Sequence, residues 1–507
     1  MIDLRADFLE TLQGLLAEIA PECEARVFGS RYRWTASNTS DLDVALVGPG
    51  KLPWKTLARL NVALEESVLP FRVDVLDWHA ISPEFRKVIE EGYEVIQKRN
   101  WENVRFENAP LEIIDGDRGV NYPKQSDFMA NGHCLFLNAG NVTKRGFDFS
   151  DCSFISEAKD NRLRKGKLTR HDIVLTTRGT VGNLAFYDDR IPFENIRLNS
   201  GMVIIRPNKD RIFPRYLYFL LKSSIFKEQV SAFTTGSAQP QLPIRDINRI
   251  EFPLPPLPEQ RAIAGMLGAL DDKIELNQRM NATLESLARA VFRQRFVENE
   301  EAQEWNILPL SRVCASIFSG GTPSTTKPEY WNGGIPWLSS GETRERFVID
   351  TDKTISQIGM DHSSTRFAHQ GSTVIASAGQ GKTRGQTSLL MFDTYINQSV
   401  VVLNANKNVV SDLYLFFDLS GRYEEFRQMS DSHSSRGSLT TKLLGDLRIT
   451  VPPIKLIESF TEFAQPIVEK IYLNLQESRT LASLRDGLLP RLMRGEVRVV
   501  DNGLGNE

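Results

Sequence analysis

The chain has 507 residues, of which 41% are apolar and 25% are charged, and its formal net charge at pH 7 is −3. At roughly 100–200 residues per domain the length predicts about three or four domains, and the composition excludes collagen-like, disordered and disulfide-scaffold chains. No apolar stretch is long enough to cross a membrane, and the four widely spaced cysteines predict neither a disulfide framework nor a zinc site, so we expect a cytoplasmic protein.

Residues 1–100 predict a small α/β domain with a carboxylate site. Helices are expected over 4–20 and 54–66, and strands over 25–28, 41–47 and 72–76. Asp41 and Asp43 are two apart on one strand, so their carboxylates share a face, and Asp74 lies in the middle of the next strand. Three carboxylates from two neighbouring strands suit Mg²⁺ beside a phosphate chain, which the Gly29-Ser30 turn can approach closely.

The segments FGSRYRWTASNTSDLDVALVG (28–48) and RVDVLDW (72–78) resemble the G-S…D-x-D signature and third-carboxylate strand of the minimal nucleotidyltransferase family. The resemblance implies a nucleoside triphosphate and Mg²⁺ as cofactors. It implies that Gly29 and Ser30 hold the triphosphate, and that Asp41 and Asp43 bind metal. Asp74 would assist metal binding or act as general base. The segment RYRW (31–34) departs from the family pattern, in which small residues follow G-S-R.

The remainder of the chain is an internal repeat. Residues 242–297 align with 439–494 at an offset of 197 without a gap, and eight of the fifteen residues in 273–287 are identical to their counterparts. Upstream segments match at offsets of 198 to 204, which places small insertions in loops. The chain after residue 100 is therefore a globular half and a helix, followed by a second globular half and a second helix.

Each half ends in a Pro-Pro corner and about forty helix-compatible residues. Apolar residues step by four and three from 263 to 291 and from 460 to 488, as in a coiled-coil seam, and Pro466 is expected to kink or restart the second helix. Two arrangements stay open: each helix packs on its own half, or the two pair with each other. Both seams carry Asn at the same point, Asn277 and Asn474, and a buried Asn fixes register, so pairing is favoured.

The globular halves are β-rich and mildly basic, with net charges of +4 over 101–253 and +1 over 305–452. Polar Gly-rich loops join the strands, and their Arg, Lys, Gln, Thr and Tyr side chains are of the kinds that read base edges and anchor phosphates. The candidate DNA-binding residues are Arg118, Tyr122, Lys124, Arg178, Thr180, Gln239, Gln241, Thr322, Lys327, Tyr330, Gln380, Lys382 and Arg436.

PLPPLPEQRAIAGMLGALDDKIELNQ (253–278) and LRDGLLPRLMRGEVRV (484–499) resemble the central and distal conserved regions of type I restriction-modification specificity subunits. IDGDRGVNYPK (114–124) and SGGTPSTTKPEYWNGGIPWLS (319–339) resemble the openings of their target-recognition domains. The resemblance implies a non-catalytic subunit that reads a bipartite site in double-stranded DNA and docks modification and restriction subunits. S-adenosylmethionine and ATP would belong to those partners, and the paired helices would set the spacer.

The expected fold is α+β and multidomain, with an antiparallel coiled coil. We divide it into a nucleotidyltransferase-like domain (1–100), a first target-recognition domain (101–253), a central helix (254–300), a second target-recognition domain (301–452), a distal helix (453–500) and a tail (501–507). Two functions stay open. One is a specificity subunit fused to a nucleotidyltransferase-like domain. The other is a nucleotidyltransferase that transfers NMP to a protein or nucleic acid and is targeted by a DNA-binding scaffold.

Overall fold

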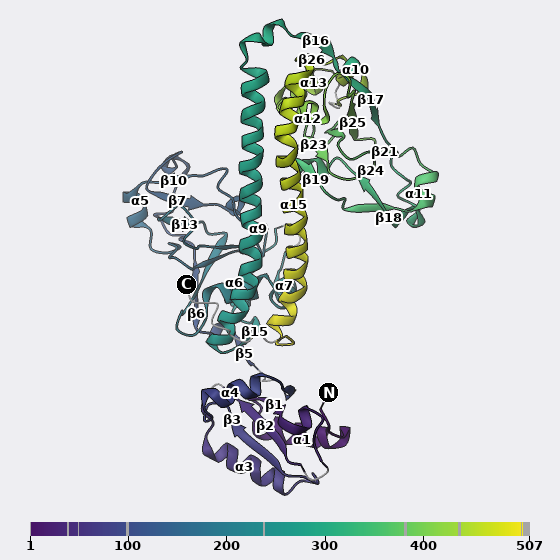
Figure 1. The fold of residues 1–507 in the computed structure, drawn as a ribbon. Helices are drawn as coiled ribbons and strands as arrows, with labels where there is room; N and C mark the ends of the chain where they lie inside the picture. Colours follow the sequence, from purple (N-terminus) through teal and green to yellow (C-terminus); the bar gives the residue numbers. More distant parts are fainter. Residues whose placement is uncertain are drawn as a thin grey trace. The chain divides into compact units, whose positions relative to one another are not determined.

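The computed structural model describes residues 2–37, 40–48, 50–97, 101–236, 239–379, 383–433, 438–497 and 499. The chain forms two compact units, one made of Met1–Ala269 with Leu484–Glu507 and the other of Leu270–Ser483. Each unit contains β-sheets and short helices, and the two long helices α9 and α15 contribute to both units (Figure 1). Among the described residues, no helix is both long and apolar enough to cross a membrane.

The N-terminal part is a four-stranded sheet in the order β3-β2-β1-β4. Its strands are β1 (Glu24–Phe28), β2 (Leu42–Val47), β3 (Val73–Asp77) and β4 (Glu94–Gln97). Side chains from α1 (Ala6–Ile19) and α3 (Trp54–Glu65) share a core with Leu42, Val44 and Leu46 on one face of β2. Ala45 points to the other face, where it packs with Ile89 of α4 (Pro83–Glu90). Because both faces are covered, β2 is an almost continuous apolar run.

The first globular half contains two sheets, in the orders β12-β11-β14-β6 and β10-β7-β13. The strands of the larger sheet are β6 (Leu111–Asp115), β11 (Ile173–Thr176), β12 (Leu184–Phe186) and β14 (Met202–Pro207), and those of the smaller are β7 (Cys134–Leu137), β10 (Phe154–Ile155) and β13 (Ile196–Leu198). Residues Ile173 and Ile205 pack with helices α6 (Pro214–Lys222) and α7 (Ser224–Phe233), while Val174 and Ile204 face a second core. This alternation is that of a sheet buried on both sides.

The second half repeats this plan with longer sheets, in the orders β17-β25-β22-β23-β19 and β20-β18-β24-β21. Here β22 (Thr373–Ala376) pairs with β25 (Val400–Ala405), and helix α12 (Asp412–Ser420) has the nine residues of α6. The other strands are β17 (Cys314–Ser319), β18 (Trp331–Leu338), β19 (Phe347–Val348), β20 (Lys353–Ile355), β21 (Arg366–Ala368), β23 (Thr387–Leu390) and β24 (Thr394–Ile396). Register agrees as well, because Ile173 pairs with Ile205 and the corresponding Thr373 pairs with Leu403. The duplication read from the sequence is thus a duplication of strand pairing.

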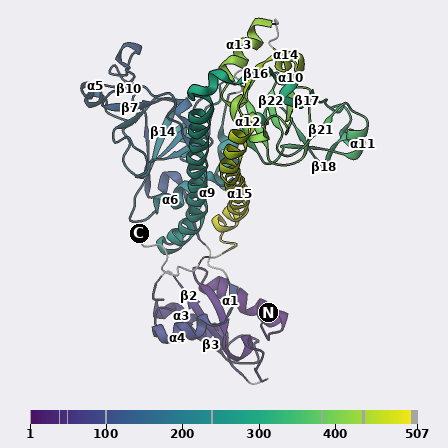
Figure 2. The same ribbon diagram turned by 45° about the horizontal axis from the view of Figure 1, so that its top comes forward.

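The long helices are α9 (Leu257–Phe292) and α15 (Ile454–Met493), and their segments lie side by side within each unit (Figures 1 and 2). In the unit Leu270–Ser483, Lys273 forms an ion pair with Glu477 at 3.1 Å, and the rings of Phe292 and Phe460 lie 5.4 Å apart. Contacts that ascend along one helix and descend along the other define an antiparallel pair.

Helix α15 continues through Pro466, so the expected restart of the helix at this residue was wrong. Pro466 is exposed, whereas the neighbouring Ala464 and Ile467 are buried in the core. A proline removes one backbone hydrogen bond, and packing of the flanking apolar residues offsets that loss.

Candidate functional sites

The carboxylate site lies where β2 and β3 run in parallel. Asp43 and Asp74 are paired directly across the two strands, and side chains paired in this way stand on the same face of a sheet. Asp41 is exposed and comes immediately before β2. Partial burial, then the charge of Asp74 and then that of Asp41, raise the pKa of Asp43 above its ordinary value. The predicted carboxylates therefore concentrate negative charge at one place, as a cation-binding site requires.

The turn that closes this site starts at Gly29, the first residue of the short helix α2 (Gly29–Tyr32). Gly29 has φ +75°, and a Cβ atom there would lie only 2.2 Å from Oδ2 of Asp43. No other residue type fits both requirements, because side chains disfavour this φ and the space is already filled. Gly29 thus brings the backbone of the predicted phosphate-binding turn directly against the carboxylates, and Ser30 follows at a half-buried position.

The segment RYRW does not fill the site with side chains. Arg31 is buried, donates from Nη2 to the carbonyl of Ser40 at 2.8 Å and lies 4.2 Å from the centroid of the Phe71 ring. Tyr32 packs into the domain core and lies close against Gly92, whereas Trp34 is 63% exposed. The bulk of Tyr32 is therefore accommodated within the domain core. Arg31 holds the chain that leads into Asp41, a role that the sequence reasoning missed although Arg31 directly follows Gly29-Ser30.

A second group missed from the sequence is Arg72. Its Nε atom forms an ion pair with Oδ1 of Asp74 at 2.9 Å, because residues two apart on a strand share a face. Within the described part of the chain, no group of three or more His, Cys, Asp or Glu side chains is arranged so that it could hold a metal ion. The donor set of three carboxylates fits Mg²⁺ in kind, but Arg72 is the cation that engages Asp74 in this structure.

In the first half, three of the predicted DNA-binding residues lie where two Gly-rich loops meet. Arg178 forms an isolated β-bridge with Gln241, whose backbone also pairs with Thr235. Thr180 and Gln239 are exposed on the same two loops. The fold therefore brings together residues 176–183 and 234–241, which are separated by about fifty positions in sequence. This juxtaposition supports a shared surface, although base contact stays a prediction.

The other candidates of the first half serve local structure as well. Arg118 is half exposed and forms an ion pair with Asp115 at 3.0 Å. The ring of Tyr122 packs against Phe136, with centroids 5.8 Å apart. Lys124 is exposed, and its backbone N–H donates to Asp127. Only the guanidinium of Arg118 and the ammonium of Lys124 are thus charged groups at the surface here.

In the second half, the side chain of Thr322 donates to Gln398, and Nζ of Lys327 donates to the hydroxyl of Tyr330 at 2.9 Å. Tyr330 is only 6% exposed, so its ring is placed as a core residue and does not present a face to DNA. The candidates Gln380, Lys382 and Arg436 lie outside the described residues.

The helical seam contains the two predicted asparagines. Asn277 is fully buried, and its Nδ2 donates to Glu477 at 2.8 Å and to Ser478 at 3.3 Å. Asn474 is 1% exposed and donates to Asn281 at 2.9 Å. Both amides thus bond across the helix pair, which is the arrangement that a register-fixing Asn needs. The Asn277 hydrogen bond, first among several causes, lowers the pKa of Glu477.

Comparison with known families decides the membership of the duplicated region. The model described as type I restriction modification DNA specificity domain matches residues 111–286 and 302–465. The chain belongs to this family. A second model, polymerase beta nucleotidyltransferase, matches residues 21–102. The specificity family thus accounts for both halves of the repeat, and the carboxylate site lies in the nucleotidyltransferase match.

Individual relatives divide in the same way. The MjaIX specificity subunit of Methanocaldococcus jannaschii is 25% identical over 73% of this chain and 85% of that protein, and the HindI specificity subunit of Haemophilus influenzae is 21% identical over 75% and 98%. The probable protein adenylyltransferase MntA of Haemophilus influenzae is 37% identical over 19% of this chain and 86% of that protein. The crystal structure of the type I S subunit from M. genitalium has a TM-score of 0.53 at 16% identity, covering 78% of this chain and 96% of that chain, which shows the shared fold of the specificity family.

Proposed function

We propose that this chain is the DNA sequence-specificity subunit of a type I restriction-modification complex, acting in the cytoplasm. The observation that carries the proposal is the duplication: two β-rich halves with exposed polar loops, each followed by a long helix that pairs with the other. Each half would read one part of a bipartite site in double-stranded DNA. The paired helices would dock the modification and restriction subunits, to which S-adenosylmethionine and ATP belong.

The six segments defined from the sequence are part of this proposal. They place the boundary of the nucleotidyltransferase-like domain at residue 100, and the boundaries of the first recognition domain, the central helix, the second recognition domain and the distal helix at 253, 300, 452 and 500. Support comes from the start of α9 at Leu257 and of α15 at Ile454, each shortly after a Pro-Pro corner.

The test of this function is reconstitution. Purified chain mixed with modification subunits and S-adenosylmethionine should methylate DNA at one bipartite sequence and at no other. The chain alone should not methylate. Methylation with no sequence preference, or a preference that is unchanged when the chain is omitted, would contradict the proposal.

For residues 1–100 we propose a nucleotidyltransferase that uses a nucleoside triphosphate. The pairing of Asp43 with Asp74 beside Gly29 favours this activity, because it places carboxylates against a backbone turn suited to phosphates. Asp41, Asp43 and Asp74 would hold Mg²⁺, which supplies neutralisation of the triphosphate charge. An acceptor oxygen would attack the α-phosphorus, the bond to the β-phosphate would break, and pyrophosphate would leave. Asp74 would accept the acceptor proton when it does not bind metal.

Labelled nucleotide transfer tests this second activity. Asp41→Ala combined with Asp43→Ala should abolish transfer of an α-labelled nucleotide while DNA binding by the same protein persists. Glu18→Ala is the matched control, since Glu18 is an exposed carboxylate of the same domain that pairs only with Arg59, at 3.2 Å. Transfer that continues in the double variant would remove these carboxylates from the mechanism.

A further inference from the structure

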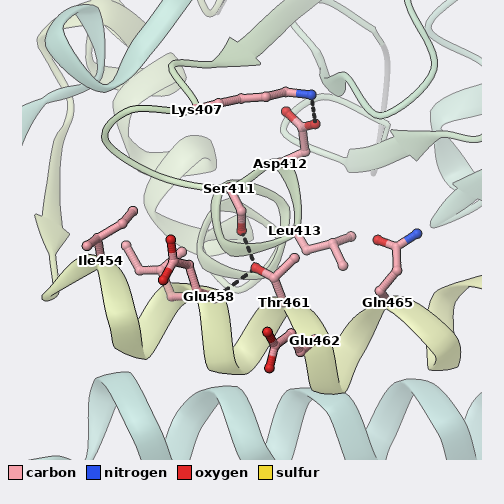
Figure 3. Close-up of a pocket in the computed structure, with 10 residues that line it drawn as sticks. Lys407, Ser411, Asp412, Leu413, Ile454, Glu458, Thr461, Glu462 and Gln465 are labelled. Atoms are coloured by element: carbon pink, nitrogen blue, oxygen red, sulfur yellow. Dashed lines mark hydrogen bonds and ion pairs between the residues drawn. The ribbon is translucent and has the colours of Figure 1, made fainter.

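A pocket of about 600 Å³ opens beside the start of α15 in the second half of the repeat (Figure 3). One wall is the helix surface that carries Ile454, Glu458 and Glu462, and the other is the beginning of α12 with Asp412 and Leu413. The volume falls in the range of sites that hold a ligand or an anchoring side chain. All of these residues belong to the unit Leu270–Ser483.

The internal repeat supplies a reference for this pocket. Tyr216 of α6 donates to the carbonyl of Pro253, and the corresponding Tyr414 of α12 donates to that of Thr450. The short helix and the strand that precedes the long helix are therefore related in the same way in both halves. Positions in the pocket can be compared with their counterparts one by one.

In the first half an arginine of the chain itself covers the long helix. Arg215, the counterpart of Leu413, lies against Gly268, so that a Cβ atom on Gly268 would be 2.7 Å from its Cζ atom. Its Nη2 atom donates to the carbonyl of Gly268 at 3.3 Å. Gly268 is buried beneath this guanidinium, whereas its counterpart Gln465 is exposed.

The second half replaces the cation with negative charge. Arg261 and Gly265 of α9 correspond to Glu458 and Glu462 of α15, which are both exposed on the pocket wall. Lys407 is the basic residue of the lining, and it forms an ion pair with Asp412 at 3.3 Å. The charge of Lys407 is thus matched within the pocket, and the two glutamates give the lining a net negative charge.

We propose that this pocket binds an arginine side chain supplied by a partner protein, in the position that Arg215 occupies in the first half. The aliphatic stem would pack on Leu413 and Ile454, and the guanidinium would reach Glu458 and Glu462. Arginine suits the site because its planar fork can engage carboxylates at two points and pack on apolar surface. The negative lining repels nucleic-acid phosphates, so the occupant is protein.

The pocket makes the two halves of the repeat unequal. In the first half the counterpart position is filled from within the chain, and in the second it is open to a partner. A protein that inserts an arginine therefore binds one half in preference to the other, independently of what the recognition loops read.

The experiment uses the full chain and two short probes, acetyl-Gly-Arg-Gly-amide and the same peptide with neutral citrulline in place of arginine. Ligand-observed NMR titration should show saturable binding of the arginine peptide and none of the citrulline peptide. Glu458→Gln with Glu462→Gln should weaken binding at least about tenfold, since it removes both charge-assisted hydrogen bonds. Glu424→Gln, an exposed carboxylate of α13 (Tyr423–His433) in the same unit, should leave it unchanged.

A second variant protects the test against unfolding. Leu413→Arg with Gln465→Gly rebuilds the arrangement of the first half, so the chain's own arginine should fill the pocket and abolish peptide binding. Circular dichroism of each variant checks that the fold is retained. Equal binding of the arginine and citrulline peptides, or unchanged arginine binding in the glutamine variant, would overturn the proposal.

Discussion

Gly29→Ala should destabilise the N-terminal part of the chain and disable its proposed nucleotide site. The φ of +75° costs a non-glycine residue about 1–2 kcal/mol. The new Cβ would also lie 2.2 Å from Oδ2 of Asp43, so the carboxylate must move, at a further cost of ~1–3 kcal/mol typical of overpacking. The expected loss is therefore about 2–5 kcal/mol, and Asp43 leaves its position opposite Asp74.

Hydrogen exchange of the full chain measures this loss locally. Amides of β2 should exchange at least roughly 30-fold faster, since each 1.4 kcal/mol is about tenfold. The matched control is Gly14→Ala, in the exposed middle of α1, where a Cβ would meet nothing within 4 Å. It should stabilise the domain by roughly 0.5–1 kcal/mol. The steric argument fails if Gly29→Ala exchanges like the unmodified chain while Gly14→Ala shows its expected gain.

Three further changes test other parts of the structure. Asp43→Asn should raise the thermal midpoint of the N-terminal domain at pH 7, because the raised pKa of Asp43 means that its ionised form destabilises the fold; the gain should vanish below pH 3.8, its ordinary pKa, and a gain that persists there would contradict this cause. Asn277→Ala removes a fully buried amide and its hydrogen bonds across the seam, and should cost about 1–3 kcal/mol in denaturant unfolding, whereas no change would argue against a seam held by these bonds. Arg178→Ala should weaken DNA binding and reduce the slope of log K against log salt by about 1, and an unaltered slope would mean that Arg178 contacts no phosphate.

The sequence predicted the elements and their duplication well, because these depend on local patterns. The alternation and apolar runs of 41–47 and 72–76 gave β2 and β3 within one residue, and the seam pattern gave the helix pair with Asn277 and Asn474 inside it. Pro466 was misjudged because tertiary packing around it, which no local rule describes, holds the helix continuous.

The sites were only partly predictable, because they depend on which side chains meet across the fold. The Asp43–Asp74 pairing follows from two parallel strands, but the Arg72 ion pair with Asp74 depends on a rotamer choice that a sequence does not state. Tyr330 was expected on the surface because its loop is polar, yet burial of its ring contributes more stability than exposure.

The measurement that tests the central claim most directly is the pattern of adenine methylation in the host genome with and without this gene. Sequencing that detects modified bases should find one bipartite motif methylated in the parent strain and unmethylated after deletion, with methylation restored by the intact gene. The Asp41→Ala, Asp43→Ala double variant should restore it equally well, because recognition belongs to residues 101–507. A methylation pattern that deletion leaves unchanged would contradict the assignment of this chain as a specificity subunit.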